Sequence, residues 1–260
     1  MPRITAGLVL FTAALASSSV SATVVTPADL KGWETYTYGT SSPAPYGAIT
    51  AAFPHLGNGS AEIGLYDQGV TTVQWWYQLT TATPLSSLNQ LSFDWYVSSS
   101  STTPAFTTPA FGMYVTSANG SGYLIWEGAY NGTSGGAAQD TWVSSDILND
   151  KFWWNSSDGT GICANASAYE TLSWFKTNCL GDTAEVVGLS PFLGNGYAGT
   201  QFFGAFDNVA YGFRDGASDS FNFEVATAAI PEPATLTLLG LALAGLATSR
   251  RQKRQGRTAS

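Results

Sequence analysis

Nine tryptophans supply the strongest candidates for ligand binding in this chain. Two adjacent pairs stand out, Trp75-Trp76 and Trp153-Trp154. Neighbouring side chains on a β-strand point to opposite sheet faces, so one member of each pair can pack in a core while the other faces outward. An outward indole offers a large rigid surface and a polar N–H, which suits a sugar ring. We expect ligand contacts at Trp76, Trp126, Trp153 and Trp154; the alternative is that all nine tryptophans pack the interior.

Carboxylates are the candidates for catalysis. Glycoside hydrolysis needs two carboxyl groups about 5 to 9.5 Å apart across a cleft. Asp94 and Glu127 are the pair to consider, but no spacing rule selects them over Glu62 or Asp67. A Ser-His-Asp arrangement would have to recruit His55, the single histidine, from a loop rich in Pro and Gly. The sequence therefore predicts a protein that is not an enzyme and has no catalytic residues.

The elements that position these residues are expected to be short β-strands. In Leu91–Val97 every second residue is large and apolar, which is typical of a half-buried strand. Residues Ala166–Phe175 have some helical character, although their last five residues fit a strand equally well. Eight or nine strands without an internal repeat predict an all-β fold, a single antiparallel β-sandwich with jelly-roll topology preferred. The other strand candidates are Ala61–Leu65, Val73–Leu79, Phe111–Val115, Tyr123–Ala129, Ala184–Leu189, Gln201–Phe213 and Phe221–Val225.

Charge and cysteine content limit the possible partners. Residues 23–229 contain seventeen acidic and four basic residues, hence a net charge of -13. Such a surface repels phosphate backbones, so nucleic acid is excluded as a partner. Cys163 and Cys179 are expected to form one disulfide, with two free buried thiols as the alternative.

The N-terminal end predicts export. Arg3, the apolar stretch Ala6–Ala16 and the small residues Val20-Ser21-Ala22 form a signal peptide expected to be removed after residue 22. The alternative is that this opening segment stays as a membrane anchor. Residues 23–229 then form one passenger domain.

The C-terminal end has three parts in a fixed order. Pro231-Glu232-Pro233 precedes sixteen uncharged residues, 234–249, and a basic cluster that ends at Arg254. A helix of sixteen residues is about 24 Å long, slightly short of a hydrocarbon core of about 30 Å. The basic cluster should remain in the cytoplasm, which places everything before Pro231 outside. We expect a short transmembrane helix within 230–254 and a cytoplasmic tail at 255–260.

These three parts resemble the PEP-CTERM sorting signal of Gram-negative bacteria. The resemblance implies recognition of Pro231, Glu232 and Pro233 by an exosortase, a membrane-embedded enzyme that cuts nearby. It also implies an intermediate held in the inner membrane by the C-terminal helix, followed by transfer to the cell surface or extracellular matrix. An ordinary anchor helix after a Pro-rich linker is the alternative.

Six short segments carry a second resemblance: Gly57–Ile63, Leu91–Tyr96, Trp126-Glu127, Phe152–Trp154, Gly204–Val209 and Phe221–Glu224. This series looks like the passenger domain of many PEP-CTERM proteins. Its stretch Phe206-Asp207-Asn208-Val209 also looks like the last strand of galactose-binding-like jelly-rolls and several carbohydrate-binding modules. This resemblance implies that Asp207 helps to hold a structural Ca²⁺, with Glu34 or Glu62 as further ligands. Regular alternation places Asp207 on one strand face with Phe203, Ala205, Val209 and Tyr211; the alternative is that it caps a turn or accepts backbone N–H bonds.

Together these features predict an exported envelope or matrix protein that binds exopolysaccharide without catalysis. A purely structural matrix or adhesion protein is the alternative, and a glycoside hydrolase is a third.

Overall fold

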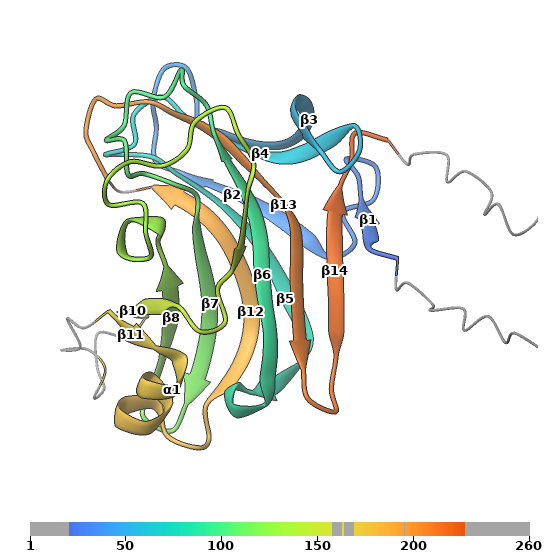
Figure 1. The fold of residues 1–260 in the computed structure, drawn as a ribbon, viewed down its shortest axis with the longest axis vertical. Helices are drawn as coiled ribbons and strands as arrows, with labels where there is room; N and C mark the ends of the chain where they lie inside the picture. Colours follow the sequence, from blue (N-terminus) through green and yellow to red (C-terminus); the bar gives the residue numbers. More distant parts are fainter. Residues whose placement is uncertain (1–20, 158–162, 164–168, 195, 227–260) are drawn as a thin grey trace, which may run out of the picture.

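Two facing β-sheets make up most of the part of the chain that the computed structural model describes, residues 21–157, 163, 169–194 and 196–226 (Figure 1). The expected signal peptide lies almost entirely outside these residues, and the expected sorting signal lies outside them altogether. No helix within the described residues is long and apolar enough to cross a membrane.

Sheet I holds both ends of the described chain. Its strand order is β1-β14-β13-β4-β3, and β6 joins β13 on the other side and carries β9. Among the described strands only β1 and β14 pair in parallel. The strands are β1 (Thr23–Val25), β3 (Tyr46–His55), β4 (Gly59–Leu65), β6 (Leu88–Val97), β9 (Val143–Asp146), β13 (Phe202–Phe213) and β14 (Ser218–Phe223).

Sheet II has the order β11-β10-β8-β7-β12-β5-β2. Its strands are β2 (Trp33–Tyr38), β5 (Thr72–Pro84), β7 (Ala110–Ser117), β8 (Gly120–Trp126), β10 (Lys151–Ser156), β11 (Glu170–Thr171) and β12 (Glu185–Gly194). The chain crosses from sheet to sheet between β4, β5, β6 and β7, as in a jelly-roll. The predicted antiparallel β-sandwich is confirmed.

Short helical turns lie at the edges. Within the segment of uncertain type at 166–175, Glu170–Thr171 form strand β11 and Leu172–Phe175 form the short helix α1. Cys163 and Cys179 form the predicted disulfide beside it. The turns are η1 (Leu85–Ser87), η2 (Gly128–Tyr130), α1 (Leu172–Phe175) and the π-helical turn η4 (Lys176–Leu180).

The core lies between the sheets and is built from the inward residues of alternating strands. Leu91, Phe93, Trp95 and Val97 of β6 are all buried there, as the alternation predicts. From sheet II, Trp75 meets aromatic rings of β13 and β14 edge-on. Such edge-to-face contacts add to the apolar burial that stabilises the sandwich.

A β-bulge interrupts strand β13 at Asp207 and Asn208. Asp207 pairs with Asp94 of β6, whereas Ala210 pairs with Ser92, so β13 contains one extra residue. Asn208 takes up this residue with a φ of 48°, a left-handed conformation that Asn tolerates.

The bulge shifts the alternation along β13. Phe206 and Val209 both belong to the core, although they are three positions apart rather than two or four. Asp207 instead lies on the face that carries its cross-strand partner Asp94. The expectation that Asp207 shares a face with Val209 and Tyr211 is therefore wrong, because a bulge changes the two-residue period.

Candidate ligand-binding groove

The outer face of sheet II carries aromatic side chains from neighbouring strands. Trp153 of β10 pairs with Ile125 of β8, and Asn155 pairs with Tyr123. Trp76 of β5 approaches the Tyr123 ring with a centroid distance of 6.4 Å. Directly paired residues point to the same face, so these side chains form one surface across the sheet.

A groove of about 470 Å³ crosses this surface. Three rings line it, those of Tyr123, Trp153 and Phe192, and the half-exposed Tyr38 stands at its edge. Its volume falls within the range of ordinary ligand sites. The full set of lining residues is Tyr38, Gly39, Val70, Thr72, Gln74, Tyr123, Ile125, Glu127, Trp153, Asn155, Phe192 and Gly194.

Glycines in the middle strands leave room for these rings. A Cβ at Gly188 of β12 would lie 2.3 Å from the Trp76 ring. A Cβ at Gly112 of β7 would lie 3.2 Å from the Tyr123 ring. The Trp76 and Tyr123 rings can therefore lie directly against the strand backbone on the outer face.

Polar groups in the groove are held in fixed positions. The Gln74 Nε2 group donates to Ser190 Oγ at 2.9 Å and to Tyr123 Oη at 3.2 Å. These bonds orient the amide and the phenol before any ligand arrives, which lowers the entropy cost of binding.

Glu127 lies next to Trp153 in the groove. The Trp153 indole N–H donates to Glu127 Oε1 at 3.0 Å. Burial raises the pKa of the Glu127 carboxyl group, and the indole bond partly opposes that shift. Glu127 therefore offers the groove a fixed hydrogen-bond acceptor.

The four tryptophans expected to contact a ligand divide between two environments. Trp153 lines the groove, and Trp76 lies on the same outer face. Trp126 and Trp154 belong to the core, with 2% and 7% of their surface exposed. Trp126 instead donates its indole N–H to Asp150 Oδ2 at 2.8 Å inside the structure. In each adjacent pair the two tryptophans do point to opposite faces. Only Trp76 and Trp153, the outward members, lie on the outer face of sheet II.

Asp94 and Glu127 do not face each other. Glu127 lines the groove on the outer face of sheet II, whereas Asp94 lies on sheet I with its carboxylate toward His55. The core separates the two sheets, so this pair cannot act across one glycosidic bond.

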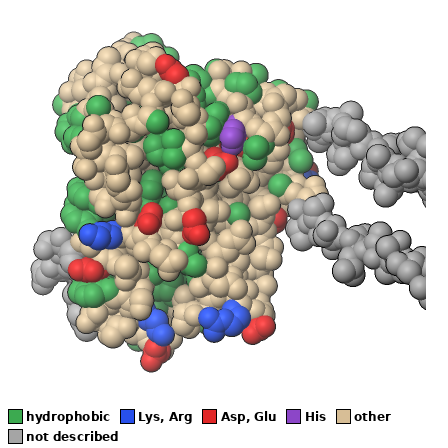
Figure 2. Space-filling model, viewed as in Figure 1, with side chains coloured by type: hydrophobic (Ala, Val, Ile, Leu, Met, Phe, Trp, Pro, Cys, Tyr) green, Lys and Arg blue, Asp and Glu red, His purple; other side chains and the backbone are tan. Residues whose placement is uncertain are grey.

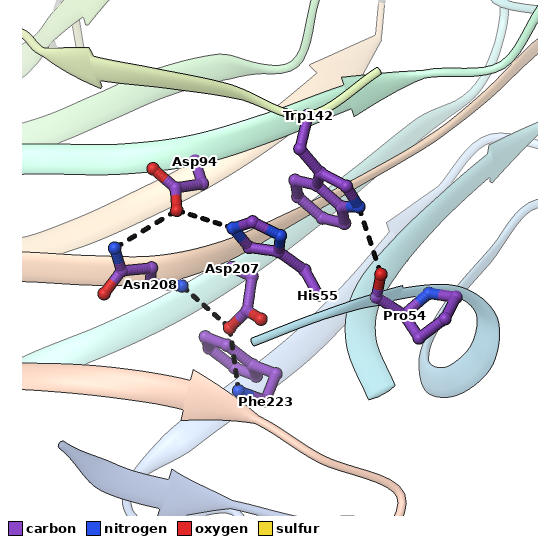
Figure 3. Close-up of polar contacts among 7 residues, drawn as sticks. All are labelled: Pro54, His55, Asp94, Trp142, Asp207, Asn208 and Phe223. Carbon is purple, nitrogen blue, oxygen red and sulfur yellow. Dashed lines mark hydrogen bonds and ion pairs between the residues drawn. The ribbon is translucent and has the colours of Figure 1, made fainter. Parts of the chain in front are cut away.

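A compact polar cluster surrounds Asp94 on sheet I (Figure 3). Asp94 Oδ2 lies 2.7 Å from His55 Nε2 and accepts the Asn208 amide N–H at 3.1 Å. The Trp142 ring stacks on His55 with a centroid distance of 4.2 Å. These contacts fix the end of β3 against β6 and β13.

Asp207 lies fully buried beneath this cluster. Its Oδ1 accepts the backbone N–H groups of Asn208 at 2.7 Å and of Phe223 at 2.9 Å. Its Oδ2 is buried without a partner among the described residues. Burial raises the pKa of Asp207 to about 8, and the nearby carboxylates of Glu224 and Asp94 add to the rise. A neutral carboxyl group that accepts backbone hydrogen bonds matches the alternative expectation for Asp207, that it accepts backbone N–H bonds.

The three residues expected to bind calcium do not come together. Glu62 bonds to Thr50 and Tyr46 on the β3 side of sheet I, and Glu34 pairs opposite Trp76 in sheet II. No group of three or more His, Cys, Asp or Glu residues within the described chain is arranged to hold a metal ion. Asp207, Glu34 and Glu62 therefore do not fit one calcium site. Calcium binding stays a prediction, tested by melting the protein with Ca²⁺ and with chelator.

Two glycine-rich segments have the spacing of known motifs but not their context. Residues 132–136 read Gly-Thr-Ser-Gly-Gly, the spacing of a nucleophile elbow, yet they lie in the loop between η2 and β9 rather than in a strand-to-helix turn. Residues 194–199 have the spacing G-x-G-x-x-G, yet they lead from β12 to β13 instead of opening a helix. Neither segment supports catalysis or dinucleotide binding.

The tail of the chain is similar to one known signal. Residues 229–251 match the PEP-CTERM protein-sorting motif. This match includes Pro231, Glu232 and Pro233, which lie outside the described residues. The motif indicates an exported protein.

Several solved structures are similar to this chain at low identity and low TM-score. One is a family 11 carbohydrate-binding module of the cellulase Lic26A-Cel5E of Clostridium thermocellum, with 12% identity, 73% of this chain and 94% of that chain covered, and a TM-score of 0.41. Another is a family 11 module of Clostridium thermocellum in complex with a β-1,3-1,4-mixed-linked tetrasaccharide, with 12% identity, 68% and 87% coverage, and a TM-score of 0.39. No curated protein matches the chain.

Proposed function

We propose that this exported protein binds polysaccharide in the groove of sheet II and does so without catalysis. The observation that carries the proposal is the combination in that groove of aromatic surfaces and oriented polar groups. Trp153, Tyr123 and Phe192 supply the rings, while Gln74 and Glu127 supply a fixed amide and carboxylate. Sugar rings have apolar faces and hydroxyl edges, which such a surface can contact together.

The charge of the groove favours a neutral glycan. No Lys or Arg is among its lining residues, and Glu127 is acidic. On the face drawn in Figure 2 charged side chains are few and scattered, without a basic patch. A polyanion would therefore meet no countercharge in the groove.

The lining also favours binding over hydrolysis. Glu127 is the one carboxylate among the described residues that line the groove. A glycosidase that works through two carboxyl groups would need a second on the other side of the bond.

Binding to a panel of soluble polysaccharides tests the proposal. The panel contains a β-glucan, a galactan, a mannan and a polyuronate, titrated against the purified full-length chain. We expect saturable binding to a neutral polymer, and Trp153→Ala should weaken it at least tenfold because an aromatic contact of about 1.5–3 kcal/mol is lost.

Trp142→Ala is the matched control, since Trp142 is a half-buried indole on the outer face of sheet I. It should leave the affinity unchanged. Equal loss in both variants would place the site elsewhere, and absence of binding to every polymer would favour a purely structural matrix protein.

We also propose that an exosortase processes the tail and releases the domain to the surface or matrix. The support is the match of residues 229–251 to the sorting motif. Changing Glu232→Ala should leave the full-length chain in the membrane fraction, as seen on an immunoblot. If the tail of the Glu232→Ala chain is removed as in the unchanged chain, the proposal is contradicted.

A further inference from the structure

A second hollow lies beside the groove, at the end of sheet II where β12 stops; we call it the end pocket. It measures about 340 Å³ and shares Glu127, Phe192 and Gly194 with the groove. A chain lying in the groove can therefore continue past Glu127 into the end pocket. Its lining residues are Gln68, Phe106, Thr107, Thr108, Ala110, Glu127, Gly128, Ala129, Tyr130, Phe192, Leu193, Gly194, Gly196 and Tyr197.

Gln68 provides oriented donors in the end pocket. Its residue surface is only 2% exposed, and its Oε1 accepts the backbone N–H of Tyr197 at 3.3 Å. This bond fixes which way the amide points, because only the oxygen can accept from an N–H. The Nε2 group then makes no hydrogen bond to any described residue, so its two donors remain for a ligand.

A glycine keeps this amide uncovered. A Cβ at Gly196 would lie 2.6 Å from Gln68 Nε2, too close for any side chain to fit without displacing the amide. Thr107 adds a buried hydroxyl whose Oγ has no partner among the described residues. The end pocket thus has unused hydrogen-bonding groups in its wall, which native proteins rarely leave unsatisfied.

The rest of the wall limits what can bind. Ala110, Phe192 and Leu193 form an apolar surface, and Tyr130 and Tyr197 stand half-exposed at the rim. Among the described residues that line the end pocket there is no Lys or Arg, and Glu127 disfavours an anion. The suitable group is neutral, accepts hydrogen bonds from an amide and carries a small apolar part.

We propose that the end pocket is a second subsite that binds the acetyl group of an N- or O-acetylated sugar. The acetyl carbonyl accepts from Gln68 Nε2, and its methyl group lies against Ala110, Phe192 and Leu193. The inference rests on the proposed function, since the rest of that polysaccharide lies in the groove.

Nuclear magnetic resonance of the full-length chain separates the two sites. The side-chain amide signals of Gln68 report on the end pocket, and the indole N–H signal of Trp153 reports on the groove. With N-acetylglucosamine at millimolar concentration we expect shifts of the Gln68 signals that glucose at the same concentration does not produce.

The variant Gln68→Glu keeps the shape and the Tyr197 contact but replaces the donors by an oxygen. It should weaken N-acetylglucosamine binding at least tenfold. Gln78→Glu makes the same change at an exposed position of β5 and should have no effect.

Shifts of equal size with both sugars, or no Gln68 shift with either, would overturn the acetyl assignment. A Trp153 shift with a panel polysaccharide in the absence of any Gln68 shift would leave the groove as the only site. If Gln68→Glu does not fold, the comparison of N-acetylglucosamine with glucose on the unchanged chain still tests the acetyl assignment.

Discussion

At the scale of single residues, Asp207 shows how burial, reinforced by neighbouring carboxylates, can keep an acid neutral. Two backbone N–H groups bond to one of its oxygens, yet desolvation outweighs them and raises the pKa to about 8. Glu224 and Asp94 lie close enough to oppose its ionisation, and His55 holds the Asp94 carboxylate. The folded chain therefore binds a proton here at pH values where the unfolded chain has lost it.

This proton couples stability to pH. Because the pKa of Asp207 in the folded chain lies above its ordinary value of 3.8, the stabilisation is complete below about pH 4 and is lost as pH rises through about 8. In the variant Asp207→Asn this side chain stays neutral at every pH. The change in unfolding free energy between pH 4 and 8 should therefore be smaller by up to about 5 kcal/mol than in the unchanged chain. Denaturant unfolding from pH 4 to 8 measures it.

Asp215→Asn is the control, an exposed carboxylate in the turn between β13 and β14. It should keep the pH dependence of the unchanged chain. A slope in Asp207→Asn as steep as that of the unchanged chain would refute the assignment.

Sequence reasoning reached part of the groove at this scale. Trp76 and Trp153 follow from alternation in adjacent tryptophan pairs, since one member must turn outward. Gln74 lies on β5 with Trp76, and Tyr123 and Phe192 lie on β8 and β12. These three residues could not be selected, because the sequence does not show which strands lie side by side in sheet II.

At the scale of elements, the β3–β4 turn is fastened to the end of β14. Asn58 N donates to Glu224 Oε2 at 2.5 Å, and Val225 N donates to Asn58 Oδ1 at 3.2 Å. Asn222 bonds the other Glu224 oxygen at 2.9 Å. The buried Glu224 carboxylate thus accepts hydrogen bonds from both segments and joins the β3–β4 turn to the end of β14.

Gly57 allows this approach. A Cβ at Gly57 would lie 1.6 Å from Glu224 Oε1, so Gly57→Ala must displace the carboxylate from its bonds. We expect a loss of about 1–3 kcal/mol of unfolding free energy.

Gly135→Ala supplies the comparison, because a Cβ there meets nothing within 4 Å. Thermal melting should show little change for it. Similar melting temperatures for both variants would mean that the β3–β4 turn accommodates the added Cβ without loss of stability.

The bulge in β13 is one feature that the sequence did not predict, and strands β1, β2, β3, β9 and β10 are others. A two-residue alternation in the sequence does not show where an extra residue is inserted. Asn208, with a φ of 48°, can be recognised as the bulge residue only once the pairing of β13 with β6 is known. The faces of β5, β6 and β7 carry no bulge within their apolar runs, and there alternation identified the core residues correctly.

At the scale of the whole molecule, the fold class followed from sequence and the strand order did not. Many short alternating strands with few charges leave a two-sheet sandwich as the way to bury one face of each. Which strands become neighbours depends on packing between distant segments, such as β12 between β5 and β7.

The disulfide contributes to the stability of the whole molecule. Cys163 and Cys179 are 16 residues apart, and closing such a loop stabilises the fold by about 3 kcal/mol. Reduction should lower the denaturation midpoint correspondingly. The variant with both cysteines changed to Ser should start at the lower value and not respond to reductant; a response would point to another effect of the reagent.

The position of β14 has a consequence for how copies of this protein act together. This strand, the last one described, belongs to sheet I, while the groove opens on the far side of sheet II. A copy held by its C-terminal side turns its groove away from whatever holds it. Many copies on one support would then meet the same long polymer at millimolar effective concentration, so that grooves of modest individual affinity hold it by avidity.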